Sequence, residues 1–553
     1  MGIFAMRPSV AALAIAALLG LAPTSAAAHW ERQVHEPDGR GSVPVYRTTG
    51  PTELVCGTDF SEFMRRIAGY SGELMMKNLG LFDECRARGH RYLQEAIDAA
   101  PDGARILMLP GVYSEEASLA PLSEECLHLK TPIAVTGFPL LSHEQQKQCP
   151  HLENLVGIFD RRNLQIEGTG AAPSDVVLDG KWQKLEILRA DRANGIYLRN
   201  FQVQKANDNA IYILETDGFV IDHVLSRWND SYGFLSFATD HGLYTDCEAY
   251  GNGDSGIYPG GTSDINHNRG FDVPRYAVEV RNCHSHDNVV GYSGTGGDSV
   301  WVHDSEFDRN TIGASMDSAF PNHPGLPQNH AKLERNRIHN NNANFYASIR
   351  DGTCKRPYAD RGLDEGKLCP TVGPPIGTGV IIAGGNYNLF RDNWVYDNWR
   401  VGFILLWVPG FVRGDLSLGT QFDNSFNNRF SANHMGVSPA GGAAPNGLDY
   451  WWDGVGSGNC WGDGSADPPG IPRCGAFGPT LGVPDVGKLA YNFNCSNYSR
   501  MDSYLPPGCD WFNDPPRPGT VTWDARWLTP IEALIVAYIL FSRIRRRARR
   551  RDG

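Results

Sequence analysis

Short runs of alternating apolar and polar residues recur through the middle of the chain, and each is followed by a polar turn. The runs include NGIYLRNFQV from Asn194, SGIYP from Ser255 and VGFILLWV from Val401. Alternation with a period of two predicts β-strands, and the Asn, Asp and Gly residues between the runs predict turns. The shortest repeats are about 22 residues long, which indicates a repeat architecture of small units.

A unit of this size cannot bury its own apolar face, but stacked units can, because each strand then pairs with the strands above and below it. The pattern therefore predicts an all-β fold, a single-stranded right-handed parallel β-helix (a solenoid) over residues 92–436. Asparagines recur at equivalent turns and could stack as a ladder, although ordinary turn chemistry explains them equally well: Asn229, Asn252, Asn288, Asn310 and Asn341.

Two flanking segments carry a resemblance to a known class. YLQEAIDAAPDGARILMLPGVY (92–113) predicts a helix ended by Pro-Asp-Gly and then a strand, and it resembles the N-terminal capping helix of pectin-lyase-like β-helices. DYWWDGVGSGNCWGDG (449–464) resembles the closing segment of β-helix repeat proteins of the periplasmic copper-accessory type. The resemblance covers residues 92–465. It implies the fold and no catalytic set, since this superfamily holds lyases, hydrolases, epimerases and non-enzymatic binders.

The termini carry export and membrane signals. Residues 1–28 read as a signal peptide, with Arg7, an apolar run and a small-residue cleavage site. Residues 527–553 read as a hydrophobic anchor with a basic cytoplasmic tail; an amphipathic or nucleic-acid-binding tail is the alternative. Residues 29–91 are expected to form an irregular N-terminal cap and 437–526 a Gly-, Pro- and Cys-rich C-terminal cap. We expect an exported monomer, extracellular or at the cell surface, tethered to the cytoplasmic membrane by its C-terminal segment.

The twelve cysteines indicate disulfides in an exported chain, because oxidising compartments preserve them. Metal ligation is the rival explanation, but the chain has no CxxC spacing. Sequence alone fixes no connectivity, and pairing between neighbours is the simplest hypothesis: Cys56/Cys85, Cys126/Cys149, Cys247/Cys283, Cys354/Cys369, Cys460/Cys474 and Cys495/Cys509.

The net charge limits the classes of partner that the protein can bind. The formal net charge is −12, and setting aside the +1 of the leader and the +6 of the tail leaves the body at about −19. An acidic body disfavours nucleic acid, because phosphate contacts need clustered Lys and Arg. It also repels a polyanionic glycan unless a metal or a local basic pocket intervenes.

Four segments interrupt the short coils, and equivalent corners of a stacked coil lie on one line. We therefore expect these insertions to project from one side of the rod and to wall a groove: residues 260–276, 317–331, 350–379 and 410–423. A groove on this side would bind a polysaccharide or a cell-surface glycan.

The groove gathers candidate residues of two kinds. Aromatic rings can stack on sugars, and polar groups can bind hydroxyls; the substrate-binding candidates are Tyr258, Asp264, His267, Tyr292, Asp351 and Trp407. The catalytic candidates are Asp298, Asp317, His323 and Arg350.

Two reactions fit this set. In a lyase or epimerase, His323 or His330 would take the proton beside a uronate carboxylate that Arg350 neutralises. In a hydrolase, Asp298 and Asp317 would be the carboxylate pair. All of these residues also have ordinary structural explanations, as loop caps, turn residues or a loop-fixing ion pair.

Two further classes of function stay open. The protein could be a non-catalytic, surface-anchored β-helix that binds a glycan or a partner. It could also be a copper or calcium accessory protein, but no Met-rich or His-rich tract supports copper, and the scattered Asp and Asn residues show no calcium spacing. His284, His286 and His303 could hold a metal, although His-x-His is common in strands. The sequence does not identify a cofactor; calcium is the cofactor with which it is compatible.

Overall fold

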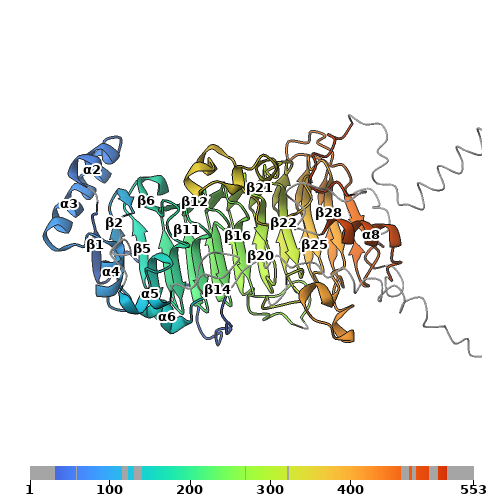
Figure 1. Ribbon diagram of the computed structural model, residues 1–553, viewed down its shortest axis with the longest axis horizontal. Coiled ribbons are helices and arrows are strands. Elements are labelled where there is room, and N and C mark those ends of the chain that lie inside the picture. Colours follow the sequence, from blue (N-terminus) through green and yellow to red (C-terminus); the bar gives the residue numbers. More distant parts are fainter. Residues whose placement is uncertain are drawn as a thin grey trace, which may run out of the picture.

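The computed structural model describes residues 31–57, 59–114, 123–129, 140–267, 269–320, 323–462, 472–475, 481–496 and 509–519. These residues form a rod of stacked coils (Figure 1). Every pair of neighbouring strands in its three sheets is parallel. The chain is a right-handed parallel β-helix, as the repeats predict.

Sheet A has twelve strands and runs the whole length of the rod. Its strands are, in order, β1 (Thr52–Val55), β2 (Arg105–Met108), β5 (Gln165–Gly168), β8 (Ile196–Arg199), β11 (Asp217–Asp222), β14 (Asp240–Thr245), β17 (Val278–Arg281), β20 (Val300–His303), β23 (Lys332–Glu334), β26 (Leu389–Arg391), β29 (Arg429–Ser431) and β32 (Cys460–Trp461).

Sheets B and C have ten strands each. Sheet B contains β3 (Gly111–Tyr113), β6 (Val176–Asp179), β9 (Gln202–Gln204), β12 (Leu225–Arg227), β15 (Glu248–Tyr250), β18 (His284–His286), β21 (Glu306–Asp308), β24 (Arg337–His339), β27 (Trp394–Tyr396) and β30 (His434–Met435). Sheet C contains β4 (Asn154–Phe159), β7 (Glu186–Asp191), β10 (Asn209–Leu214), β13 (Phe234–Phe237), β16 (Ser255–Gly260), β19 (Val290–Ser293), β22 (Ile312–Asp317), β25 (Thr378–Ala383), β28 (Val401–Leu406) and β31 (Tyr450–Trp452).

The predicted capping helix is present. Helix α4 (Leu93–Ala99) buries Leu93, Ala96 and Ile97 against the first coils and is followed by strand β2, as the 92–113 pattern predicts. The segment before it is not irregular, contrary to the sequence expectation. It contains strand β1 and helices α2 (Phe60–Ile67) and α3 (Gly72–Arg88). Phe63 and Phe82 stack at 4.4 Å between the two helices, so this end of the rod has an apolar core of its own.

The predicted asparagine ladder is also present. The side-chain nitrogen of Asn252 donates to Oδ1 of Asn288 at 2.7 Å, and the same contact continues coil by coil from Asn229 to Asn446. The ladder lies at the turn from sheet B to sheet C, and its members are buried. Two further ladders were not predicted: Asn336, Asn393 and Asn433, and Gln328, Asn388, Asn428 and Asn459.

All six cysteine pairs form as the sequence hypothesis proposed, and no cysteine is free. Six disulfides are typical of a protein outside the cytoplasm. Within the described ranges, no helix combines the length and the apolar character needed to cross a membrane. The expected signal peptide (1–28) and anchor (527–553) lie outside the described residues, so both remain predictions.

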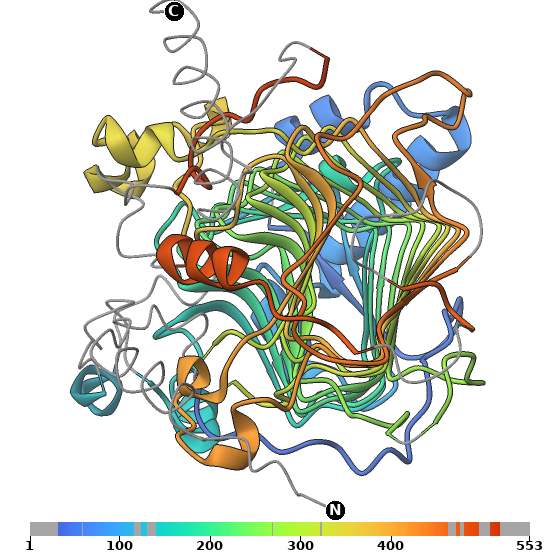
Figure 2. The same cartoon turned by 90° about the vertical axis from the view of Figure 1, so that its right-hand side faces the viewer.

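The insertions do not all leave one corner, which corrects the sequence expectation. Residues 260–276, 317–331 and 410–423 connect sheet C to sheet A, whereas 350–379 connects β24 of sheet B to β25 of sheet C. The third insertion therefore rises at the opposite edge of sheet C. Figure 2 shows it (yellow) and the 410–423 segment (orange) at the two edges of the same sheet. The physical reason is that this insertion follows a strand of sheet B, whereas the other three follow a strand of sheet C, and the repeat pattern does not reveal which sheet a strand belongs to.

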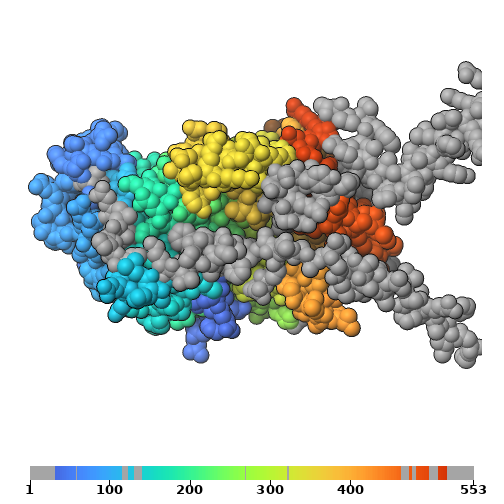
Figure 3. All heavy atoms as spheres, viewed as in Figure 1, coloured from blue at the N-terminus to red at the C-terminus, as the bar shows by residue number. Residues whose placement is uncertain are grey.

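Other parts of the chain cover the outer face of sheet C between these edges. Residues 31–36, here the N-terminal strap, lie on its first strands: Arg32 contacts Glu215 at 2.7 Å and Asp191 at 3.0 Å. Helix α8 (Val486–Cys495) covers the last strands, where the Lys488 amine donates to the carbonyl of Trp452 at 2.8 Å. The 350–379 insertion and α8 are both at the surface in Figure 3. Sheet C is therefore the most elaborated face of the rod.

Candidate functional site

The candidate site is a polar network on the outer face of sheet C that borders a cavity. Asp317 ends strand β22, and alternation along the strand turns it outward while Met316 enters the core. Its Oδ2 accepts hydrogen bonds from Thr295 Oγ1 at 2.6 Å and from Ser315 Oγ at 2.5 Å. Burial raises the pKa of Asp317 above its usual range. A buried carboxyl with a raised pKa can hold a proton and donate it.

A tyrosine–histidine pair lies on the neighbouring coils. The Tyr258 hydroxyl donates to Nε2 of His323 at 2.5 Å, and Nδ1 of His323 donates to the carbonyl of Pro324 at 2.7 Å. Since a carbonyl oxygen only accepts, the hydrogen of His323 must be on Nδ1. Burial lowers the pKa of His323 to about 4, so the imidazole is neutral at neutral pH. Burial also raises the pKa of the Tyr258 hydroxyl.

Thr295 is a polar neighbour of both the pair and the carboxyl. Its hydroxyl donates to Asp317, and its presence works against the rise in the pKa of the Tyr258 hydroxyl that burial causes. The 317–331 insertion brings His323 back over the sheet, where its ring lies 4.7 Å from that of Phe237. We call Tyr258, Thr295, Ser315, Asp317 and His323 the sheet C network.

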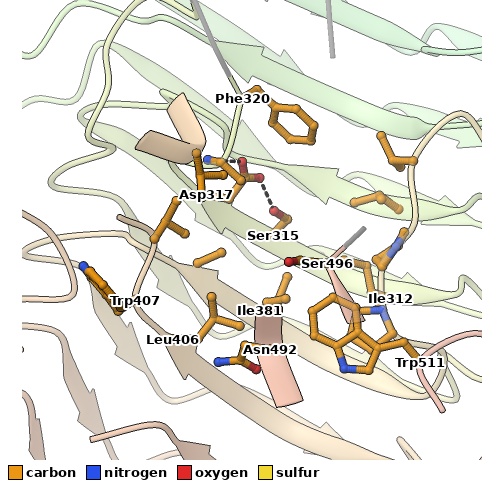
Figure 4. A pocket seen from close by; sticks show the side chains of 18 of the residues that line it. Ile312, Ser315, Asp317, Phe320, Ile381, Leu406, Trp407, Asn492, Ser496 and Trp511 are labelled. Carbon is orange, nitrogen blue, oxygen red and sulfur yellow. Dashed lines mark hydrogen bonds between the residues drawn. The ribbon is translucent and has the colours of Figure 1, made fainter. Parts of the chain in front are cut away.

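A cavity of about 110 Å³ borders this network (Figure 4). Its floor is the outer face of β19, β22, β25 and β28, and α8 contributes a wall. Asp317 and Ser315 meet the cavity at one side, and Trp407 at another. The Trp407 ring stacks on Phe422 at 5.0 Å, and its Nε1 donates to the carbonyl of Gln421 at 2.8 Å.

Asp254 also lines the cavity and was not among the sequence candidates. Its two oxygens accept hydrogen bonds from Ser255 Oγ at 2.7 Å and Thr371 Oγ1 at 2.8 Å. Burial raises the pKa of Asp254 to about 6. Asp254 stands in the turn before a GIY strand, where the sequence suggests only turn chemistry. Thr295 and Ser315 were missed for a similar reason, because isolated hydroxyls carry no motif.

Asp298 lies at the same corner but is enclosed. Its Oδ1 accepts from the backbone N–H of Asn329 at 2.5 Å, and its side chain is buried. Burial and the nearby Asp264 carboxylate raise the pKa of Asp298. Asp264 bonds Ser299 Oγ and His267 Nδ1, both at 3.2 Å, and His267 is exposed. These three candidates are near one another, and none of them lines the cavity.

The remaining candidates lie elsewhere. Tyr292 points into the interior of the rod and packs on Phe307, because a local change in alternation turns it inward. The Arg350 guanidinium, at the end of α7 (Ala347–Arg350), donates to the carbonyl of Phe512. Asp351 is exposed and accepts from the backbone N–H of Thr353 at 2.9 Å. Arg350 and Asp351 follow the insertion to the other edge of sheet C, so they do not join the network.

Three groups of described residues have the geometry to hold a metal ion, and all lie outside the sheet C network. In the first, His286 is held between Glu248 at 3.0 Å and Asp287 at 2.7 Å, and its pKa is raised to about 9, against the cost of burial. A protonated imidazole has no lone pair for a metal. The groups are Glu248, His284 and His286; Asp217, Asp240 and His241; and Asp222, His223 and Asp246.

No family model matches the chain, and no curated protein is similar to it in sequence. Among solved structures, it is similar to the A-module of a mannuronan C-5 epimerase from Azotobacter vinelandii, with 14% identity, a TM-score of 0.39, and 69% of this chain and 95% of that chain covered. It is also similar to a pectate lyase, with 11% identity, a TM-score of 0.32, and 79% and 80% covered.

An alginate lyase from a Paenibacillus strain gives 11% identity and a TM-score of 0.30, with 66% of this chain and 95% of that chain covered. Likeness at this level says nothing about what this chain binds or catalyses. The β-helix is established by the chain's own three parallel sheets.

Proposed function

We propose that this protein acts on a polysaccharide at the sheet C network, by removing the proton beside a uronate carboxyl group. The supporting observation is the pairing of a neutral imidazole with a phenol, next to a carboxyl whose pKa is raised by burial. Lyases and epimerases both need a base and an acid in reach of one sugar.

Three residues of the sheet C network have separate roles in this proposed reaction. The Tyr258 oxygen takes the proton from the sugar carbon while its own proton passes to Nε2 of His323. Nδ1 of His323 stays bonded to the carbonyl of Pro324, which holds the ring in orientation. Asp317, in its acid form, donates a hydrogen bond where negative charge develops.

This division replaces the role first assigned to Arg350. None of the described residues that line the cavity is Arg or Lys. A uronate carboxylate next to an ionised Asp317 would be repelled, whereas a protonated Asp317 can donate to it. The raised pKa of Asp317 is therefore the condition on which a uronate substrate depends.

The test is incubation with alginate, pectate and other uronate glycans, following both the ultraviolet absorbance of unsaturated products and the C5 configuration by NMR. Tyr258→Phe keeps the ring and removes the hydroxyl, and should lower the rate about 100-fold or more. Tyr250→Phe is the matched control, because that hydroxyl binds Arg227 on sheet B and should leave the rate unchanged.

Hydrolysis is tested in the same reactions through reducing ends formed without unsaturation. That result, with the rate depending on Asp298 and Asp317, would replace proton abstraction by the carboxylate-pair mechanism.

A second candidate function is non-catalytic glycan binding. It is favoured by the burial of Tyr258 and Asp317, which are 1% and 6% exposed. Binding without any product, unchanged in Asp317→Asn, would support this function. Attachment to a membrane through residues 527–553 belongs to either candidate and is tested by fractionating cells that express the full chain.

A further inference from the structure

The cavity under α8 is apolar over most of its surface. Its floor is made by outward side chains of sheet C, and its walls come from segments far apart in the chain. The apolar lining consists of Val290, Ile312, Ala319, Phe320, Val372, Pro374, Pro375, Ile381, Ala383, Leu406, Trp407, Val408, Pro409, Val412, Leu489, Phe493 and Trp511. Such a lining suits an apolar ligand better than a sugar, whose hydroxyls need polar partners.

One polar group in this wall lacks a partner. Asn492 is on α8, lines the cavity and is 8% exposed. Its side-chain nitrogen has no hydrogen-bond partner among the described residues. Figure 4 shows the Asn492 side chain among Leu406, Ile381 and other apolar groups. A buried donor left unpaired lowers stability, so an acceptor supplied by a ligand would remove that cost.

The carboxyl groups at the cavity limit the charge of that acceptor. Burial raises the pKa of both Asp254 and Asp317, because neither has a nearby cation to offset it. An anionic ligand would lose its hydration in the same way, and the described lining residues include no Arg or Lys to compensate its charge. A neutral carbonyl oxygen meets no such cost.

We propose that this cavity binds a small neutral acyl ester, with its alkyl chain between α8 and sheet C and its carbonyl oxygen on the side-chain nitrogen of Asn492. The cavity, at about 110 Å³, is smaller than the roughly 150 Å³ dry cavity that holds benzene, so it takes the ester carbonyl and part of the alkyl chain and leaves the end of the chain at its open side. The proposal does not depend on the glycan reaction, because the sheet C network borders this cavity without supplying the donor, which is the side-chain nitrogen of Asn492, or the apolar walls.

Methyl hexanoate is the probe, with heptane and hexanoate as comparison ligands. Binding to the full chain is followed by the fluorescence of Trp407 and Trp511, which line the cavity, and by titration calorimetry. We expect methyl hexanoate to bind more tightly than heptane, and hexanoate at pH 8 to bind more weakly than either.

Three variants separate the contributions. Asn492→Leu removes the donor at similar volume, and should weaken methyl hexanoate about 5-fold while leaving heptane unchanged. Its melting temperature should not fall, because the lost amide nitrogen had no partner. Ala383→Phe fills the floor and should abolish both ligands, with Ala319→Phe as a second filling variant if the first fails to fold. Leu418→Phe changes a side chain that is 85% exposed and should alter nothing.

The proposal is overturned if methyl hexanoate shows no saturable binding to the wild type. It is also overturned if Asn492→Leu binds the ester as tightly as the wild type, or if the folded filling variants still bind it. Because none of these readouts measures glycan turnover, failure here leaves the proposed function untouched.

Discussion

The asparagine ladder offers the sharpest test of what holds the coils in register. We choose Asn288→Ala, in the middle of the ladder. Oδ1 of Asn288 accepts from the backbone N–H of Asn252 at 3.0 Å and from its side-chain nitrogen at 2.7 Å. The Asn288 nitrogen donates to the carbonyl of Ala249 at 3.0 Å. All of these atoms lie in the fully buried turn.

The magnitude follows from the groups left behind. Alanine would leave two donors of Asn252 without their acceptor, in a place where no water replaces it. Each unpaired buried donor costs about 1–3 kcal/mol, so the substitution should destabilise this turn by about 2–6 kcal/mol. Asn344→Ala is the matched control, since that side chain is only half-buried and donates to Asp514 on the surface; about 1 kcal/mol or less is expected.

The assay must be local, because a stack of coils need not unfold in one step. Hydrogen exchange measured on the peptide around Asn252 reports the opening of this turn directly. We expect its amide protection to fall strongly in Asn288→Ala and to be unchanged in Asn344→Ala. Equal protection in both variants would refute the view that the ladder, rather than the strand pairing alone, fixes the turn.

Three more predictions concern the sheet C face. Burial lowers the pKa of His323 to about 4, so as the pH falls below about 6.5 the unfolded chain takes up a proton before the folded one does. The contribution of His323 to the free energy of unfolding should therefore be complete above pH 6.5 and fall by about 3 kcal/mol toward pH 4. Thermal melts of His323→Phe should lose this part of the pH dependence. Burial raises the pKa of Asp254 to about 6, so its contribution to the stability of the fold is present at pH 4 and lost as the pH rises through 6. Asp254→Asn should therefore melt at a higher temperature than the wild type at pH 8 and not at pH 4. An equal difference in melting temperature at both pH values would contradict this assignment. Replacing Cys354 and Cys369 by Ser opens a loop with a sequence separation of 15 residues and should cost about 3 kcal/mol, seen as faster exchange of residues 350–379; unchanged exchange there would show that the loop is held by its other contacts.

The sequence predicts the fold well because each feature that makes a β-helix is local. Alternation in NGIYLRN or SGIYP marks strands, Asn288 and its equivalents mark one turn, and neighbouring cysteines in a short loop have few other partners. These features repeat, so each coil supports the prediction made from the next.

The candidate site is predicted only in part, because it depends on facts that no single segment contains. Tyr258, Asp317 and His323 come together since their segments share one corner of adjacent coils. Arg350 does not, because its insertion joins a different pair of sheets. Tyr292 turns inward at a break in alternation that its sequence does not mark.

The covering segments were the least predictable part. Helix α8 lies between Gly- and Pro-rich stretches, and its apolar residues do not define a single face: Leu489 and Phe493 line the cavity, whereas Tyr491 and Cys495 pack with the cluster around Trp511. Asn492 and Asp254 are functional candidates only because the fold places both at the same cavity.

The N-terminal strap carries a consequence for how the molecule is assembled. Arg32 is made early on the ribosome, but its partners Asp191 and Glu215 follow 159 and 183 residues later. The strap must therefore stay unattached until the second and third strands of sheet C exist, and contacts so distant in sequence form slowly. The beginning of this chain is among the last parts to reach its final place.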